Sequence, residues 1–244
     1  MTVEASVLSE LQQKDNLCGA FQAARVLREL GFDADEDTVA LRAGSVLPAD
    51  PEGSVPAGET SRTDYRYDLP TAPPAESGTA AEPLAAAIES LSGGALRAVP
   101  LRGSWTAERV EQLVVRAGAR LLANVRTGPL WGTHPSVETV IEELASGDAE
   151  GPPSDWDVGH FVELVSLARG KGGSLVLVHD SYPSFGWDAR HLQPPRAVAA
   201  ALQRDDGREG GVLAVLPTKD ARRIESLAAE LGLDVATWDN GTRS

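Results

Sequence analysis

Cysteine is almost absent from this chain. Of its 244 residues, one is a cysteine, Cys18. An internal disulfide is therefore excluded, and so is a metal site built from several thiolates. A lone free thiol is typical of a reducing compartment, so we expect a cytoplasmic protein. Cys18 is then either a buried core residue, a common place for free cysteine, or a reactive group.

Positive charge and long apolar runs are also scarce. The chain carries 22 Lys and Arg against 36 Asp and Glu, a formal net charge of -14 at pH 7. Nucleic acids and anionic membranes attract clustered basic side chains, so both are disfavoured as partners. No run approaches the roughly 18 apolar residues that span a bilayer, and no charged leader precedes an apolar run at the N-terminus. Arginine outnumbers lysine and alanine is abundant, which is typical of a high-GC bacterial source.

What the sequence does contain is a mixture of helical and strand patterns. Its hydrophobic content of 42% is enough for one substantial core, and we expect a single α+β domain over residues 1–244. Apolar spacing predicts helices at 17–30, between 35 and 44, and at 82–91, 106–117, 136–144, 195–203 and 219–231. Apolar runs predict strands at 95–101, 120–126, 160–168, 174–180 and 211–216. Residues 45–79, rich in Pro, Gly, Ser and acidic residues, are predicted to form a long loop or flap, and 239–244 a frayed end.

Two of the predicted strands form a hairpin. Residues 160–168 and 174–180 are joined by a short glycine-rich connection, which favours antiparallel pairing. In such a hairpin the start of the first strand lies beside the end of the second. We therefore expect His160 and Asp180 to be neighbours despite their separation in sequence.

The position of Cys18 favours the reactive interpretation of this thiol. It is predicted in the first turn of the helix at 17–30, where the helix dipole and a nearby imidazolium would both stabilise a thiolate. Its backbone N–H is unpaired there and can point at a developing oxyanion. Gln12, six residues earlier, can supply a second donor from the preceding loop.

A thiol nucleophile also needs a base and a group that orients the base. His160, at the start of an apolar strand, is our first choice, with Asp180 as its orienting carboxylate and Asp157 as the substitute. His179 is expected on the opposite face of its strand, next to Asp180. His134 lies in a loop that is either a cleft border or a surface turn.

These residues also form a recognisable set in their order along the chain. The set comprises Gln12, Cys18-Gly19, Gly159-His160-Phe161, Asp180-Ser181-Tyr182 and Gly186-Trp187. It resembles the papain-like cysteine peptidase superfamily and is most similar to its bacterial C39-like branch. The resemblance implies a papain-like fold, in which the nucleophile heads a central helix packed on an antiparallel sheet. It further implies that Cys18 is the nucleophile, His160 the general acid and base, Asp180 its orienter and Gln12 the oxyanion donor.

The implied activity is thiol-dependent hydrolysis of peptide or amide bonds, such as peptide maturation, with a peptide or protein as substrate. The same chemistry serves an acyltransferase or a transglutaminase-like enzyme, and a catalytically silent peptide-binding scaffold is the competing class. The resemblance does not cover residues 45–79 or 95–158, so it implies no specificity. Trp131, Trp187 and Gly159 are candidate substrate-binding residues, although tryptophans such as Trp131, Trp156 and Trp187 equally serve packing. We expect no cofactor, and no ligand spacing indicates a metal.

Overall fold

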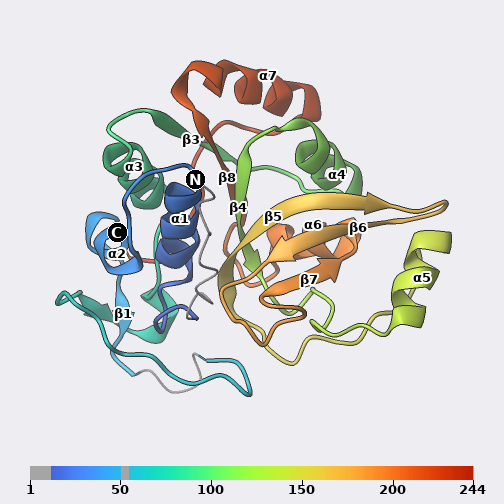
Figure 1. Cartoon of the computed structure of the whole chain (residues 1–244), viewed down its shortest axis with the longest axis horizontal. Helices are drawn as coiled ribbons and strands as arrows, with labels where there is room; N and C mark the ends of the chain where they lie inside the picture. Colours follow the sequence, from blue (N-terminus) through green and yellow to red (C-terminus); the bar gives the residue numbers. More distant parts are fainter. Residues whose placement is uncertain (1–11, 51–54, 244) are drawn as a thin grey trace, which may run out of the picture.

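A six-stranded antiparallel sheet forms the centre of the molecule (Figure 1). The computed structural model describes residues 12–50 and 55–243. The strands are β3 (Leu96–Leu101), β4 (Arg120–Arg126), β5 (Gly159–Arg169), β6 (Ser174–His179), β7 (Arg190–Gln193) and β8 (Gly211–Pro217). Their order in the sheet is β3-β8-β4-β5-β6-β7, and every neighbouring pair is antiparallel. The α+β class expected from the sequence is therefore confirmed.

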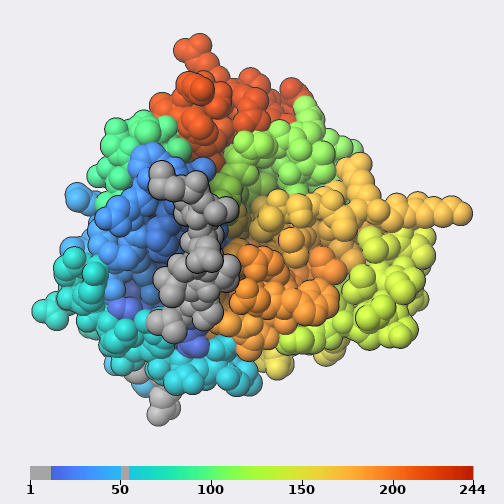
Figure 2. Space-filling view, viewed as in Figure 1, coloured from blue at the N-terminus to red at the C-terminus, as the bar shows by residue number. Residues whose placement is uncertain are grey.

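Helices cover both faces of this sheet. One group is α1 (Cys18–Glu29), α2 (Glu36–Arg42) and α3 (Ala81–Leu91), and the other is α4 (Ala107–Arg116), α6 (Pro195–Gln203) and α7 (Ala221–Leu231). Side chains alternate between two cores along a strand. In β4, for example, Leu122 joins the core of the first helix group, whereas Leu121 and Ala123 join the core of the second. Helix α5 (Val137–Ser146) lies at the edge, near the projecting tip of the β5–β6 hairpin (Figure 2).

The segment 45–79 is mostly irregular, as predicted, but its two ends are joined. It contains β1 (Leu47–Pro48), which pairs in parallel with β2 (Thr71–Ala72), and a 3-10 turn, η1 (Pro74–Glu76). The hydroxyls of Ser45 and Thr79 lie 2.8 Å apart, and Val46 N–H donates to Gly78 O. The excursion therefore leaves and re-enters the fold at one place, beside the start of α1.

All the helices and strands predicted from the sequence are present with small shifts at their ends, and the β5–β6 hairpin is confirmed. A further 3-10 turn, η2 (Thr218–Asp220), precedes α7. Strand β7 was not predicted, because its four residues include charged and polar side chains. The frayed end predicted at 239–244 is wrong for Asn240, which is buried and donates a 2.9 Å hydrogen bond to Thr79 O. No helix in the described part of the chain is long and apolar enough to cross a bilayer.

Candidate active site

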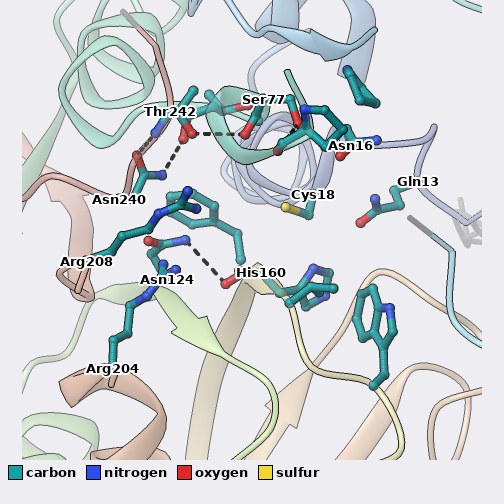
Figure 3. A pocket seen from close by; sticks show the side chains of 18 of the residues that line it. Gln13, Asn16, Cys18, Ser77, Asn124, His160, Arg204, Arg208, Asn240 and Thr242 are labelled. Atoms are coloured by element: carbon teal, nitrogen blue, oxygen red, sulfur yellow. Dashed lines mark hydrogen bonds between the residues drawn. The ribbon is translucent and has the colours of Figure 1, made fainter. Parts of the chain in front are cut away.

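A cavity of about 230 Å³ lies beside the first turn of α1 (Figure 3). Segments far apart in sequence line it: the start of α1, the end of the 45–79 excursion, the start of β5, the loop after β6 and the C-terminal segment. Cys18, His160 and Gly159 are all part of this lining. The sheet and α1 thus bring the thiol and the imidazole, which are separated by most of the chain, to one cavity.

His160 and Asp180 are hydrogen-bonded neighbours, as the hairpin predicted. His160 Nε2 lies 2.9 Å from Asp180 Oδ1, and both residues are 2% exposed. The register explains this contact, because Glu163 pairs with His179, which places the residue after β6 close to the start of β5. The prediction that these two residues meet is therefore confirmed.

Cys18 is the first residue of α1 and lines the same cavity as His160 (Figure 3). With Nε2 engaged by Asp180, the Nδ1 edge of the ring is left for the thiol. Burial by itself lowers the pKa of His160, but the Asp180 carboxylate and then Cys18 outweigh it by charge and hydrogen bonding. Together they raise the pKa of His160 to about 10. His160 is therefore an imidazolium at neutral pH.

Asp180 is held as a carboxylate by several donors. Ser181 N–H donates to Oδ1 at 2.6 Å, and His191 Nε2 lies 3.6 Å from Oδ2. Burial raises the pKa of Asp180, but the charges and hydrogen bonds of His160 and His191 outweigh it and hold the pKa well below its usual range. The Asp180 carboxylate thus stays ionised beside Nε2 of His160.

Helix α1 is fastened to the strands that carry these groups. Arg25 Nη1 donates to Asp180 O at 3.0 Å, and Gln22 Nε2 donates to His179 O at 3.1 Å. Arg25 also forms a buried ion pair with Glu163 of β5, with Nη2 3.1 Å from Oε2. These contacts fix the position of α1 along β5 and β6, and with it the position of Cys18 relative to His160.

The glutamine at the cavity is Gln13, not Gln12. The Gln12 side chain donates to Thr60 O and does not line the cavity. Gln13 does line it, beside Cys18 (Figure 3). Its Oε1 accepts a 2.6 Å hydrogen bond from the Ser181 hydroxyl, and its backbone N–H donates to Ser181 O. The prediction that Gln12 faces the site is therefore wrong by one residue.

The side-chain amide of Gln13 has one N–H that its hydrogen bonds within the protein do not use. Because Oε1 accepts from Ser181, the amide nitrogen Nε2 must face the other way, where it donates to Lys14 O at 3.2 Å. An amide nitrogen carries two protons, so one remains for a ligand in the cavity. Gln13 can therefore serve as the second oxyanion donor that was expected of Gln12.

A family model matches residues 2–239, almost the whole chain, and its description is a family of unknown function (DUF6885). The chain belongs to this family. No match was found among curated proteins. Membership in DUF6885 assigns no chemistry, so the function has to be argued from the site.

Of the three expected substrate-binding residues in this DUF6885 protein, only Gly159 lines the cavity. Trp131 is buried elsewhere, with its backbone N–H donating to Gln193 Oε1, and Trp187 is 64% exposed on the surface. Trp156 takes the position at the wall, with its ring in edge contact with the His160 ring at 5.0 Å between centroids. The Trp156 ring thus shields the His160 imidazole from one side.

The alternatives to His160 and Asp180 lie away from the cavity. His134 is exposed and hydrogen-bonds to Thr133. Asp157 pairs with Arg126 on the surface side. His179 does not line the cavity, and burial together with Arg25 and Arg190 lowers its pKa to about 3. Of these histidines and aspartates, His160 is the one that lines the cavity with Cys18, and Asp180 is hydrogen-bonded to it.

Several lining residues of the DUF6885 protein were not found by sequence reasoning. They are Arg204 and Arg208 after α6, and Asn240 and Thr242 in the C-terminal segment. The contact between His191 Nε2 and the second carboxylate oxygen of Asp180 was also not predicted. No local pattern marks these residues, because each reaches the site through tertiary packing. Among the described residues, no group of three or more His, Cys, Asp or Glu side chains could hold a metal ion.

Proposed function

We propose that this protein is a thiol-dependent hydrolase of peptide or amide bonds, working in the cytoplasm on a peptide or protein substrate. One observation carries the proposal. His160 interacts with both Cys18 and the Asp180 carboxylate, with Nε2 2.9 Å from Asp180 Oδ1, and shares the cavity wall with Cys18. A nucleophile, a base and an orienting group in that order are what amide hydrolysis by a thiol requires.

The reaction begins with attack by the Cys18 sulfur on the amide carbon. A C–S bond forms and the carbonyl electrons move to the oxygen. As the first residue of α1, Cys18 has a backbone N–H without an intrahelical acceptor, and it stabilises this oxyanion together with Gln13 Nε2. His160 gives its proton to the leaving nitrogen, the C–N bond breaks, and a thioester remains.

Water completes the cycle. His160, now neutral, removes a proton from a water molecule, which attacks the thioester carbon. The second oxyanion collapses, the C–S bond breaks, and the acid product leaves. Asp180 holds the ring in place and balances the imidazolium charge in both halves of the reaction.

The arrangement of elements supports a papain-like fold for the proposed enzyme. The proposed nucleophile heads a buried helix, α1, and the base lies at the start of an antiparallel strand, β5. The orienting residue directly follows the paired strand β6. Each of these placements is what the resemblance noted in the sequence implies.

Alkylation of Cys18 with iodoacetamide tests the proposal. In the wild type, labelling near neutral pH should be fast, and His160→Ala should slow it by at least roughly tenfold. Hydrolysis of a peptide library should be lost in Cys18→Ala. Labelling at an ordinary thiol rate that His160→Ala leaves unchanged would contradict the proposal, and amide products formed only with an added amine would show an acyltransferase instead.

A further inference from the structure

Two arginines line the side of the cavity that faces away from Gln13. Arg204 and Arg208 extend toward the interior from the segment after α6, and Cys18 lies between them and Gln13 (Figure 3). We propose that this side of the cavity binds a carboxylate group of the substrate. The inference rests on the proposed function, because it concerns which amides reach Cys18.

Asp206 holds the Arg204 guanidinium in place through two of its three nitrogens, so the third nitrogen can donate to a ligand. The Arg204 side chain is 1% exposed, and Nε and Nη2 donate to the two oxygens of Asp206 at 3.0 and 2.5 Å. Its third nitrogen, Nη1, has no acceptor among the described residues. A Cβ built on Gly159 would lie 3.4 Å from Nη1, which places this nitrogen beside the backbone just before His160. A glycine there leaves room for a ligand to reach Nη1.

The backbone of Arg204 is strained. It has φ 52° and ψ 144°, a conformation adopted almost only by glycine and unfavourable for a residue with a side chain. Neighbouring ion pairs hold it in place, since Asp206 also accepts from Arg126 Nη1 at 2.9 Å. Strained residues concentrate at ligand sites, where the fold holds a side chain in a position that relaxed backbone would not provide.

Arg208 supplies a positive charge that no described carboxylate neutralises. Its Nη2 donates to Ala75 O, and no described carboxylate forms an ion pair with it. A Cβ on Gly241 would lie 2.4 Å from Arg208 Nε, so the guanidinium packs directly against the backbone of the C-terminal segment.

The local charge opposes the charge of the whole protein. The chain carries a net charge of -14, which repels anions in general. At the cavity, however, the charge of Arg204 is offset by Asp206, and Arg208, which forms no ion pair with another described residue, adds positive charge. Guanidinium groups match the planar geometry of a carboxylate. The carboxylate of an amide substrate is either a peptide C-terminus or an Asp or Glu side chain.

Matched thiol reagents test this site without needing the natural substrate. Cys18 is labelled with N-substituted maleimides that end in a carboxylate or in the corresponding carboxamide, over a series of chain lengths. In the wild type, at one length, the acid should react about tenfold faster than the amide, and salt should reduce this ratio. Arg208→Gln should bring the ratio close to one, and Arg208→Glu should invert it. Arg102→Gln, which removes an exposed arginine paired with Glu209, is the control and should leave the ratio unchanged.

The ratio separates this inference from the proposed function. Equal ratios in wild type and Arg208→Gln at every chain length would overturn the carboxylate site, even if His160→Ala slows all labelling. If every reagent labels Cys18 slowly but the acid-to-amide rate ratio still depends on Arg208, the proposed hydrolase function would be contradicted and the carboxylate site would be supported.

Protection experiments then identify the source of the carboxylate. Three acetylated peptides compete with labelling: one with a free C-terminal carboxylate, its C-terminal amide, and an amidated peptide that contains glutamate. Protection by the first indicates a C-terminal carboxylate, and protection by the third indicates an acidic side chain. Equal protection by all three, including the neutral amide, would contradict the inference.

Discussion

His191 Nε2 lies 3.6 Å from Asp180 Oδ2, on the carboxylate oxygen that His160 does not use. The amide of Gln193 fixes the tautomer of this second ring. Gln193 Oε1 accepts from the backbone N–H of Trp131 at 2.7 Å, so the amide nitrogen of Gln193 faces His191 Nδ1 at 3.0 Å. Nδ1 is then an acceptor, and the ring proton sits on Nε2, directed at Asp180.

His191 is therefore expected to act as a positioning residue for Asp180. His191→Leu should slow iodoacetamide labelling of Cys18 by roughly two- to tenfold, the effect of losing a 3.6 Å electrostatic contact with Asp180 that is worth about 1 kcal/mol. His191→Gln, which can still donate, should recover part of the rate. His134→Gln is the matched control, because His134 is exposed and distant from Asp180. A His191→Leu protein with the wild-type rate and pH profile would contradict this role.

The two adjacent glutamines should differ sharply in their effect on turnover. Gln13→Ala should lower kcat by about 10²- to 10³-fold, the usual cost of one oxyanion donor, whereas Gln12→Ala should change it less than about twofold. Burst kinetics with an activated ester measure the acylation step. Alkylation of Cys18 forms no oxyanion, so its rate should be almost unaffected by either substitution. The reverse order of effects would return the donor role to Gln12.

A substitution at Gly19 tests how closely α1 packs against β5. A Cβ at this position would lie 3.1 Å from Phe161 and 3.2 and 3.3 Å from Thr79 and Leu84. Glycine to alanine within a helix normally stabilises by about 1 kcal/mol, but overpacking a tight interface costs about 1–3 kcal/mol. Gly19→Ala should therefore lower the free energy of unfolding and slow Cys18 labelling, because α1 moves away from β5. Unchanged labelling in a more stable protein would contradict this packing.

The His160–Asp180 pair should make stability fall as the pH rises. The pKa of His160 is raised by Asp180, so the folded state holds a proton that the unfolded state has lost above about pH 6.5. This stability is complete below about pH 6.5 and is lost as the pH rises through the folded pKa of about 10. The slope should reach about 1.4 kcal/mol per pH unit.

Urea unfolding in a Cys18→Ala background measures this slope without a contribution from the thiol. Because Cys18 also raises the pKa of His160, the loss of stability in this background should be complete at a lower pH than in the wild type. His160→Gln in the same background removes the titrating group, while all other groups remain. Subtracting the two pH profiles isolates His160. Parallel profiles over the whole alkaline range would show that His160 is not held as an imidazolium.

Local sequence determined the elements that carry the proposed catalytic groups. The apolar spacing predicted a helix over 17–30, which the structure has at Cys18–Glu29, and two apolar runs with a glycine-rich connection predicted the β5–β6 hairpin. The contact between His160 and Asp180 followed from the geometry of that hairpin. These features were predictable because periodicity and turn chemistry depend on residues that are close along the chain.

Tertiary packing decided which side chains complete the site. Gln13 rather than Gln12 faces the cavity because its amide and backbone bond to Ser181, far along the chain. His191 reaches Asp180 through a short polar strand, and Arg208 reaches the cavity by packing against Gly241. Such contacts join distant segments whose own sequences carry no sign of their partners. The sequence alone therefore determined the positions of the thiol and its base along the chain, and the folded structure decided the donors and charges around them.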